Sequence, residues 1–169
     1  MERLFLTCHC LNSNTIDVLV YHCTTFENLT LMEKTKIRVT TTIAAEISKV
    51  WDYWTKPDHI VNWNFASDDW HCPAAENNPI TGGKFKYTMA SKDGEMSFEF
   101  EGVYDEVIPQ RKIAYSLADG RQVTVTFKKE IRKTKVTETF DAEKMHSEEM
   151  QSTGWQAILD NFKHYAETT

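Results

Sequence analysis

The chain has 169 residues, a formal net charge of −6 and an aromatic fraction of 12%, which predicts one globular domain with a substantial core rich in buried rings. The acidic balance and the lack of a basic run argue against nucleic acid as a partner, and no apolar stretch approaches the roughly 20 residues that span a bilayer. Because the first residues also make a poor signal peptide, we expect a soluble cytoplasmic protein without membrane insertion.

Residues 1–32 differ in character from the rest of the chain. They carry few charges and show little sustained periodicity, so we interpret them as a poorly ordered or non-native N-terminal extension of a domain that spans residues 33–169. A functional N-terminal arm is the alternative. The extension holds thiols and imidazoles whose spacing fits no standard zinc pattern, so we expect no metal and no cofactor. These residues are Cys8, His9, Cys10, His22 and Cys23.

The domain opens with a strand and two helices. Alternating apolar residues predict the strand over 37–43, and apolar residues at helical spacing predict a helix over 45–54. A second, short helix over 57–63 follows, with Pro57 in its first turn. The aromatic-rich stretch from there to Thr81 shows neither period, so we interpret it as irregular.

Alternation and turn signals predict five more strands and a closing helix. The strands cover about 83–91, 95–107, 111–117, 121–131 and 134–141. The helix runs over 147–166 and carries one apolar stripe. Because hairpin turns join the later strands, we predict an α+β fold. In this fold a curved antiparallel sheet of six strands wraps around the long C-terminal helix, and two short helices follow the first strand.

Glycines mark places where the backbone has special needs. The pair Gly82–Gly83 permits unusual dihedrals or a close approach where the irregular stretch enters the sheet. Gly102 is a candidate for a bulge or for close packing inside a long strand. A glycine inside a helix costs roughly 1 kcal/mol relative to alanine, so Gly154 predicts a neighbour packed against the helix backbone.

Several segments of the domain resemble the START-like (SRPBCC) superfamily, and within it the branch named after the activator of the ninety-kilodalton heat-shock protein's ATPase. They include WHCP at 70–73, GGKF at 82–85, and the stretches 87–94, 98–104, 119–121 and 154–163. The resemblance covers residues 33–169 in order. It implies a helix-grip fold with a cavity between the sheet and the last helix. Related branches bind lipids, sterols, polyketides and plant hormones in this cavity, and a few catalyse cyclisation or hydrolysis.

Large apolar side chains of the domain would either line such a cavity or fill the core. We interpret the alternating residues of the 83–91 and 95–107 strands as an apolar wall, and the stretch 63–81 as the border of the cavity mouth. The bland alternative is a packed core of rings. The predicted ligand-binding residues are Trp63, Trp70, His71, Tyr87, Met89, Phe98, Phe100, Glu138, Trp155 and Leu159.

Two of these residues could carry proton chemistry. His71, with an ordinary pKa of about 6.5, suits proton transfer, although a histidine beside tryptophan is more often structural. Glu138 shares parity with Val136 and Phe140, so it should face the apolar side of the sheet as an acid, a base or a ligand anchor. The alternatives are a bulge that reverses this parity, or a place at an open sheet end in water. Cys72 gains no thiolate partner merely from its adjacency to His71.

The sequence therefore predicts a protein that binds a small apolar or amphipathic molecule without a cofactor, and a homodimer is compatible with it. One alternative is a cyclase-, dehydratase- or hydrolase-type enzyme that uses His71 or Glu138, although no nucleophile-elbow or nucleotide-binding motif occurs. A second alternative, implied by the resemblance, is a co-chaperone-like ATPase stimulator. The eukaryotic activator has a separate chaperone-binding domain, and residues 1–32 are far too short for it.

Overall fold

The computed structural model describes residues 34–169. The expectations for the N-terminal extension and for its cysteines and histidines lie outside these residues. The described elements, in chain order, are β1 (Lys36–Ile43), α1 (Ile47–Thr55), α2 (Pro57–Ile60), β2 (Trp70–Asn77), β3 (Lys84–Ser91), β4 (Ser97–Ile108), β5 (Lys112–Leu117), β6 (Gln122–Glu130), β7 (Lys133–Asp141) and α3 (Glu148–Thr168).

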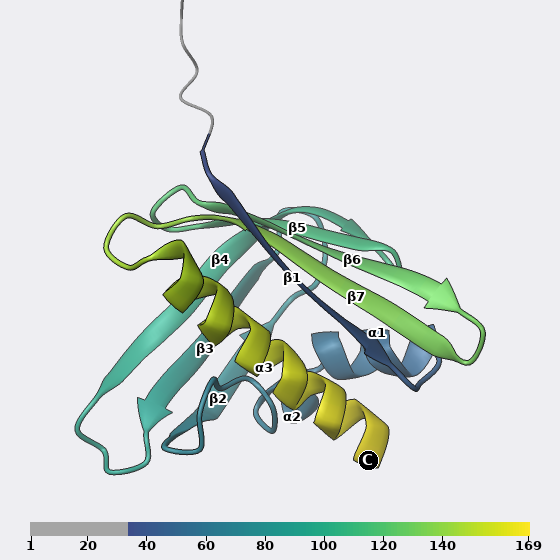
Figure 1. Ribbon diagram of the computed structural model, residues 1–169, viewed down its shortest axis with the longest axis horizontal. Helices are drawn as coiled ribbons and strands as arrows, with labels where there is room; N and C mark the ends of the chain where they lie inside the picture. Colours follow the sequence, from purple (N-terminus) through teal and green to yellow (C-terminus); the bar gives the residue numbers. More distant parts are fainter. Residues whose placement is uncertain (1–33) are drawn as a thin grey trace, which may run out of the picture. The chain divides into compact units, whose positions relative to one another are not determined.

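One antiparallel sheet of seven strands forms the frame, in the order β1-β7-β6-β5-β4-β3-β2. Consecutive strands from β2 to β7 are neighbours, and β1 pairs with β7 at the far edge. The sheet curves around α3, which crosses its concave side, while α1 and α2 lie near the C-terminal end of α3 (Figure 1). The predicted α+β helix-grip fold is therefore confirmed.

The predicted sheet is one strand short, because β2 falls in the stretch interpreted as irregular. Its sequence WHCPAAEN lacks a clean alternation and contains Pro73, which cannot donate a ladder hydrogen bond. The structure accommodates it at the sheet edge, with a register shift between His71 and Ala74 in the pairing with β3. An edge strand with a bulge tolerates a proline that a central strand would not.

The helices begin and end close to where their sequence signals place them. α1 stops before Pro57, which stands at the first position of α2. Ser147 caps α3 by accepting a hydrogen bond from the Met150 N–H at 3.2 Å, and Glu148 and Glu149 lie in its first turn, where the helix dipole favours negative charge.

α3 is fixed to the rest of the domain near both ends. At its start, the Gln151 side chain accepts from the Glu143 N–H at 2.9 Å and donates to the His146 carbonyl at 2.9 Å. Near its end, the Tyr165 hydroxyl and His59 Nδ1 lie 2.8 Å apart. These bonds join the helix to the loop after β7 and to α2.

The glycine predictions have mixed outcomes. Gly82 adopts a φ of +80°, and a Cβ on Gly83 would overlap the Asn78 carbonyl oxygen, so both needs expected of this pair are present. A Cβ on Gly102 would lie 2.7 Å from the Phe85 ring, which makes this a close-packing site. The prediction for Gly154 is wrong, because a Cβ there would meet nothing within 4 Å.

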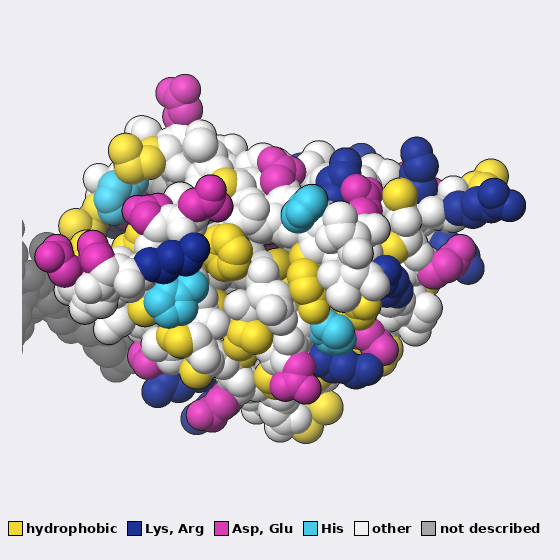
Figure 2. Space-filling view, turned by 90° about the horizontal axis from the view of Figure 1, so that it is seen from below, with side chains coloured by type: hydrophobic (Ala, Val, Ile, Leu, Met, Phe, Trp, Pro, Cys, Tyr) yellow, Lys and Arg dark blue, Asp and Glu magenta, His cyan; other side chains and the backbone are white. Residues whose placement is uncertain are grey.

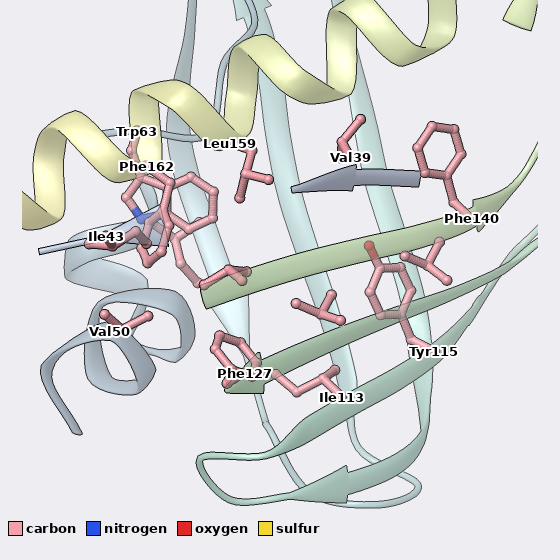
Figure 3. Close-up of a cluster of buried hydrophobic side chains, with 14 of the residues drawn as sticks. Val39, Ile43, Val50, Trp63, Ile113, Tyr115, Phe127, Phe140, Leu159 and Phe162 are labelled. Carbon is pink, nitrogen blue, oxygen red and sulfur yellow. The ribbon is translucent and has the colours of Figure 1, made fainter. Parts of the chain in front are cut away.

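The densest part of the core lies where α1 and the second half of α3 meet the sheet. Phe162 contacts the rings of Trp54 and Trp63 edge-on, with centroids 4.8 and 4.7 Å away. Ile43 and Leu159 are completely buried in the same cluster (Figure 3). At this end of α3, side chains fill the space between the helix and the sheet.

Candidate functional site

A cavity of about 270 Å³ lies between the concave face of the sheet and α3. Its walls come from β3, β4, β5 and β7, from the turn before β6, from α1 and the segment after α2, and from α3. The residues that line it are Trp54, Trp63, Asn64, Phe85, Tyr87, Met89, Phe98, Phe100, Tyr104, Ile113, Tyr115, Arg121, Glu138, Trp155 and Ile158.

Strand pairing builds the aromatic wall. The register places Tyr87 opposite Phe100 and Met89 opposite Phe98, so these alternate residues of β3 and β4 face the same side. Phe85 joins this wall, with its ring centroid 5.0 Å from that of Tyr87. The alternation seen in the sequence thus becomes one continuous surface on the concave face.

α3 supplies the opposite wall through two residues. Trp155 stacks on Phe140 with ring centroids 4.0 Å apart, and its ring meets Phe100 edge-on at 6.2 Å. Ile158 follows three residues later and lines the same cavity. The predicted residue Leu159 lies instead in the packed core, with no exposed surface.

The cavity reaches the surface at the β3–β4 hairpin. Phe98 lines the cavity and is nevertheless 52% exposed, so it forms part of the rim. Trp70 packs against Phe98 with ring centroids 5.7 Å apart, but it does not line the cavity. Over the face shown in Figure 2, acidic and basic side chains are interspersed with hydrophobic ones, without a broad area of either charge.

Glu138 is the buried carboxyl of the cavity. It lies in β7 opposite Val39 of β1 and Val125 of β6, in an unbroken register, and only 5% of its surface is exposed. A reversed parity and an open sheet end are therefore excluded. Its carboxyl has no hydrogen bond or ion pair within residues 34–169, and burial raises its pKa to about 8.

Three tyrosines place hydroxyl groups around the cavity. The Tyr104 hydroxyl donates to Asn77 Oδ1 at 2.6 Å and lies 3.5 Å from that of Tyr87. Burial raises the pKa of Tyr104 to about 12, and that of Tyr87 well above its ordinary value. The Tyr115 hydroxyl has no hydrogen-bond partner in the described part of the chain. Its pKa is also raised, first by burial and then by the nearby Glu138 carboxyl.

Arg121 is the cation in the cavity lining. It stands just before β6, and its Nε donates to the Asp119 carboxylate at 2.7 Å. In the sequence it stands at the start of the predicted 121–131 strand and in the 119–121 segment of the resemblance, but neither feature indicates a place in the cavity. Tyr104 and Tyr115, by contrast, could have been found by continuing the alternation of their strands beyond Phe100 and Ile113.

His71 does not reach the cavity. It pairs with Ala90, whose side chain points away from the face that carries Met89, so the imidazole lies on the opposite side of the sheet. Its Nδ1 is buried and lacks a hydrogen-bond partner among the described residues. Beyond it, Cys72 turns inward, and burial raises the pKa of its thiol to about 11. The site therefore assembles around Glu138 and the tyrosines.

Residues 34–169 contain no group of three or more His, Cys, Asp or Glu side chains that could hold a metal ion. None of their helices is long and apolar enough to cross a membrane.

Comparisons with known proteins identify relatives of this chain. No curated protein matches it. Among solved structures, an AHSA1-like protein from Aeromonas hydrophila is 44% identical, over 79% of this chain and 92% of that one, with a TM-score of 0.75. Chr148 from Cytophaga hutchinsonii is 49% identical over 78% and 92%, with a TM-score of 0.69.

A more distant match shows similarity of the fold alone. The Aha1 dimer from Colwellia psychrerythraea is 16% identical, over 79% of this chain and 97% of that one, with a TM-score of 0.61. The family model for Activator of Hsp90 ATPase homolog 1-like protein (AHSA1) matches residues 44–167. With this match and the two closer structures, the chain belongs to the AHSA1-like family of the START-like superfamily.

Proposed function

We propose that this protein binds a small, largely apolar molecule in the cavity between its sheet and α3. The observation that carries the proposal is an aromatic-lined hollow of about 270 Å³ where a packed core would be expected. Because the hollow reaches the surface at the β3–β4 hairpin, a molecule from solution can enter it, and burial of its apolar surface against the rings would be favourable.

The lining indicates the size and character of the ligand. Sites for drug-sized ligands span roughly 300–1,000 Å³ and are mostly apolar with a few placed polar groups. This cavity, at about 270 Å³, lies just below that range, and rings dominate its walls. A compact, flat or alicyclic body therefore fits best, with one polar group directed at Glu138.

The binding proposal can be tested with ligand and cavity variants together. Native mass spectrometry of protein purified from its own host should show a retained small molecule. Ile158→Phe adds bulk to the α3 wall and should abolish retention, whereas His164→Phe adds the same ring on the exposed side of α3 and should not. If neither the host protein nor a broad hydrophobic panel yields a complex, the proposed function is wrong.

An enzyme of the cyclase, dehydratase or hydrolase type is a second candidate, and the Glu138 carboxyl favours it. A pKa of about 8 lies near neutral pH, where a general acid or base works best. Glu138→Gln separates the two candidates, because it should abolish turnover in an enzyme while leaving binding in place. His71 is less suited to this role, since it lies on the other side of the sheet.

The protein could also interact with other proteins in two ways, as a homodimer and as a stimulator of a chaperone ATPase. The Colwellia relative is described as a dimer, so we propose that a homodimer also forms here, which light scattering would detect. Stimulation of a chaperone ATPase is suggested by the family name alone, and a direct ATP-turnover assay would test it. A cytoplasmic location remains part of the same proposal.

A further inference from the structure

Two polar groups of the cavity have no partner in the described part of the chain. Glu138 is 5% exposed and Tyr115 is 7% exposed, and both line the cavity. The other two tyrosines of the lining differ, because Tyr104 donates to Asn77 and approaches the Tyr87 hydroxyl. Their oxygens are open to the cavity and not sealed in the core, since the sealed side-chain polar atom without a partner in residues 34–169 is His71 Nδ1. Polar groups inside folded proteins are nearly always hydrogen-bonded, to protein, water or ligand. An occupant of the cavity is the natural partner for both.

Strand register brings these two side chains onto one surface. Val123 of β6 separates Tyr115 from Phe140, and on the next rung Val125 separates Ile113 from Glu138. Tyr115 and Glu138 therefore start two strands apart, about 10 Å, and one rung apart on the same concave face. In Figure 3 the Tyr115 hydroxyl rises from the sheet toward the side where α3 lies. Side chains placed in this way can converge on one group of a ligand.

We propose that Glu138 and Tyr115 together donate hydrogen bonds to an oxygen acceptor of the ligand, so that the ligand is a small apolar molecule with a carbonyl oxygen. This inference rests on the proposed binding function and adds the chemical class of the ligand. The apolar body occupies the ring-lined part of the cavity. The carbonyl oxygen lies at the β5–β7 wall, where the two unpaired groups are.

The protonation of the site favours an acceptor over a cation. Burial raises the pKa of Glu138 to about 8, so at neutral pH this group is mainly a carboxylic acid that can donate. The hydroxyl of Tyr115 is also a donor, since its pKa is raised well above the ordinary value. Arg121, the cation of the lining, is paired with the Asp119 carboxylate through its Nε at 2.7 Å. An ammonium group would meet two donors at this wall, whereas a carbonyl oxygen would meet partners.

The other groups around Glu138 do not titrate near neutral pH. β3 and β4 contribute Tyr87 and Tyr104, whose pKa values are raised by burial. The lining residues from α3 are the apolar Trp155 and Ile158, and β1 places Val39 opposite Glu138. Ligand binding between about pH 6 and 9 should therefore follow the protonation of Glu138.

Three probes with one ring system and different polar groups test this inference. Acetylnaphthalene carries a carbonyl, ethylnaphthalene carries none, and naphthylethylamine carries an amine. Binding is measured by tryptophan fluorescence and by calorimetry across pH 6 to 9.5. Two added hydrogen bonds, each with a typical net gain near 1 kcal/mol, should make the ketone bind about thirtyfold tighter than the hydrocarbon at pH 7. This advantage should shrink above about pH 8, when Glu138 ionises.

Variants assign the effect to the two side chains. Glu138→Gln retains an N–H donor, so the ketone preference should persist and lose its pH dependence. Tyr115→Phe removes one hydroxyl and should reduce the preference about three- to tenfold. Thermal melts establish that each variant is folded. NMR titration of the Glu138 carboxyl in wild-type protein needs no variant, and its pKa should rise further when acetylnaphthalene binds.

The outcomes separate the two proposals. Equal affinity for the ketone and the hydrocarbon, or an unchanged Glu138 titration, overturns the carbonyl inference and leaves the binding function standing. Tightest binding of the amine, with affinity that rises with pH, also overturns it, because Glu138 would then act as a counter-ion. If none of the probes binds and the host protein carries no ligand, the proposed function itself fails.

Discussion

The rings of Phe140 and Trp155 stack face to face, with centroids 4.0 Å apart and an interplanar angle of 15°. Phe140 lies in β7, two residues after Glu138, and is almost completely buried. Trp155 belongs to α3 and lines the cavity. This pair therefore joins the helix to the strand that carries the buried carboxyl, and it sets the width of the cavity at that point.

Loss of this stack should affect both stability and binding. Phe140→Leu keeps an apolar side chain but removes the ring contact, and we expect a loss of about 1–2 kcal/mol in the free energy of unfolding. Urea denaturation measures it. Val50→Ala is the control, since Val50 is completely buried in α1 and does not line the cavity. Both variants should lose stability, but only the first should change ligand affinity.

Glu138 should make stability fall as pH rises. Its pKa is about 8 in the folded protein and about 4.3 in an unfolded chain. The folded state therefore binds more protons between these values. The contribution is fully present below about pH 4 and is lost progressively up to about pH 8, by about 1 kcal/mol per pH unit. Glu138→Gln should remove this slope and be more stable than wild type at pH 8.

The exposed Glu101 provides the control for that experiment. Glu101→Gln changes the same chemical group on the opposite face of the sheet, so its unfolding free energy should follow that of wild type at every pH. A wild-type protein whose stability profile matches that of Glu138→Gln from pH 5 to 8 would contradict the assignment.

The two glycine sites should respond in opposite directions to alanine. Gly102→Ala brings a Cβ to 2.7 Å from the Phe85 ring and the Ser116 carbonyl oxygen, which should cost about 1–3 kcal/mol. Gly154→Ala places a methyl group in open space inside a helix and should stabilise by about 0.5–1 kcal/mol. Thermal denaturation of the pair checks both, and a loss of stability in Gly154→Ala would show that the helix packs differently.

Asp141 should support the fold at neutral pH through its hydrogen bonds. Burial alone raises its pKa, but bonds from Lys36 Nζ at 2.7 Å and from the Gln122 N–H at 3.0 Å outweigh burial and hold the pKa below its ordinary value. Because Lys36 is half exposed, most of the effect should come from the backbone bond. Asp141→Asn should cost about 1–3 kcal/mol at pH 7.

The contribution of Asp141 to stability changes with pH in the opposite direction to that of Glu138. A lowered pKa adds stability above the unfolded value, about pH 3.9, and the gain disappears as pH falls below it. The gap between wild type and Asp141→Asn should therefore narrow in acid. The exposed variant Asp105→Asn should show a much smaller gap at any pH.

Much of the fold could be predicted because its signals are local. Alternation gave the faces of β3 and β7, including the inward direction of Glu138, and helical spacing gave the apolar stripe of α3. β2 was missed because its strand character comes from pairing with β3 rather than from its own pattern. His71 stands in the stretch interpreted as irregular, so its pattern assigned it to no face of the sheet; the pairing with Ala90 places it on the face opposite Met89.

The remaining differences come from tertiary packing. An apolar helical stripe is wider than the surface of one cavity, so the sequence could not tell that Ile158 lines the cavity while Leu159 enters the core. Arg121 lines the cavity from a turn, where no periodicity exists. Contacts of this kind depend on which elements meet in space.

The hydrogen bonds at both ends of α3 limit the ways in which the cavity could open. Gln151 fixes one end of α3 and Tyr165 fixes the other. Moving the helix away from the sheet would therefore break the hydrogen bonds at both ends. The half-exposed Phe98 at the hairpin rim is held by no such bonds in the described chain. The rim at the β3–β4 hairpin, where Phe98 lies, is therefore easier to open than the side of the cavity that α3 covers.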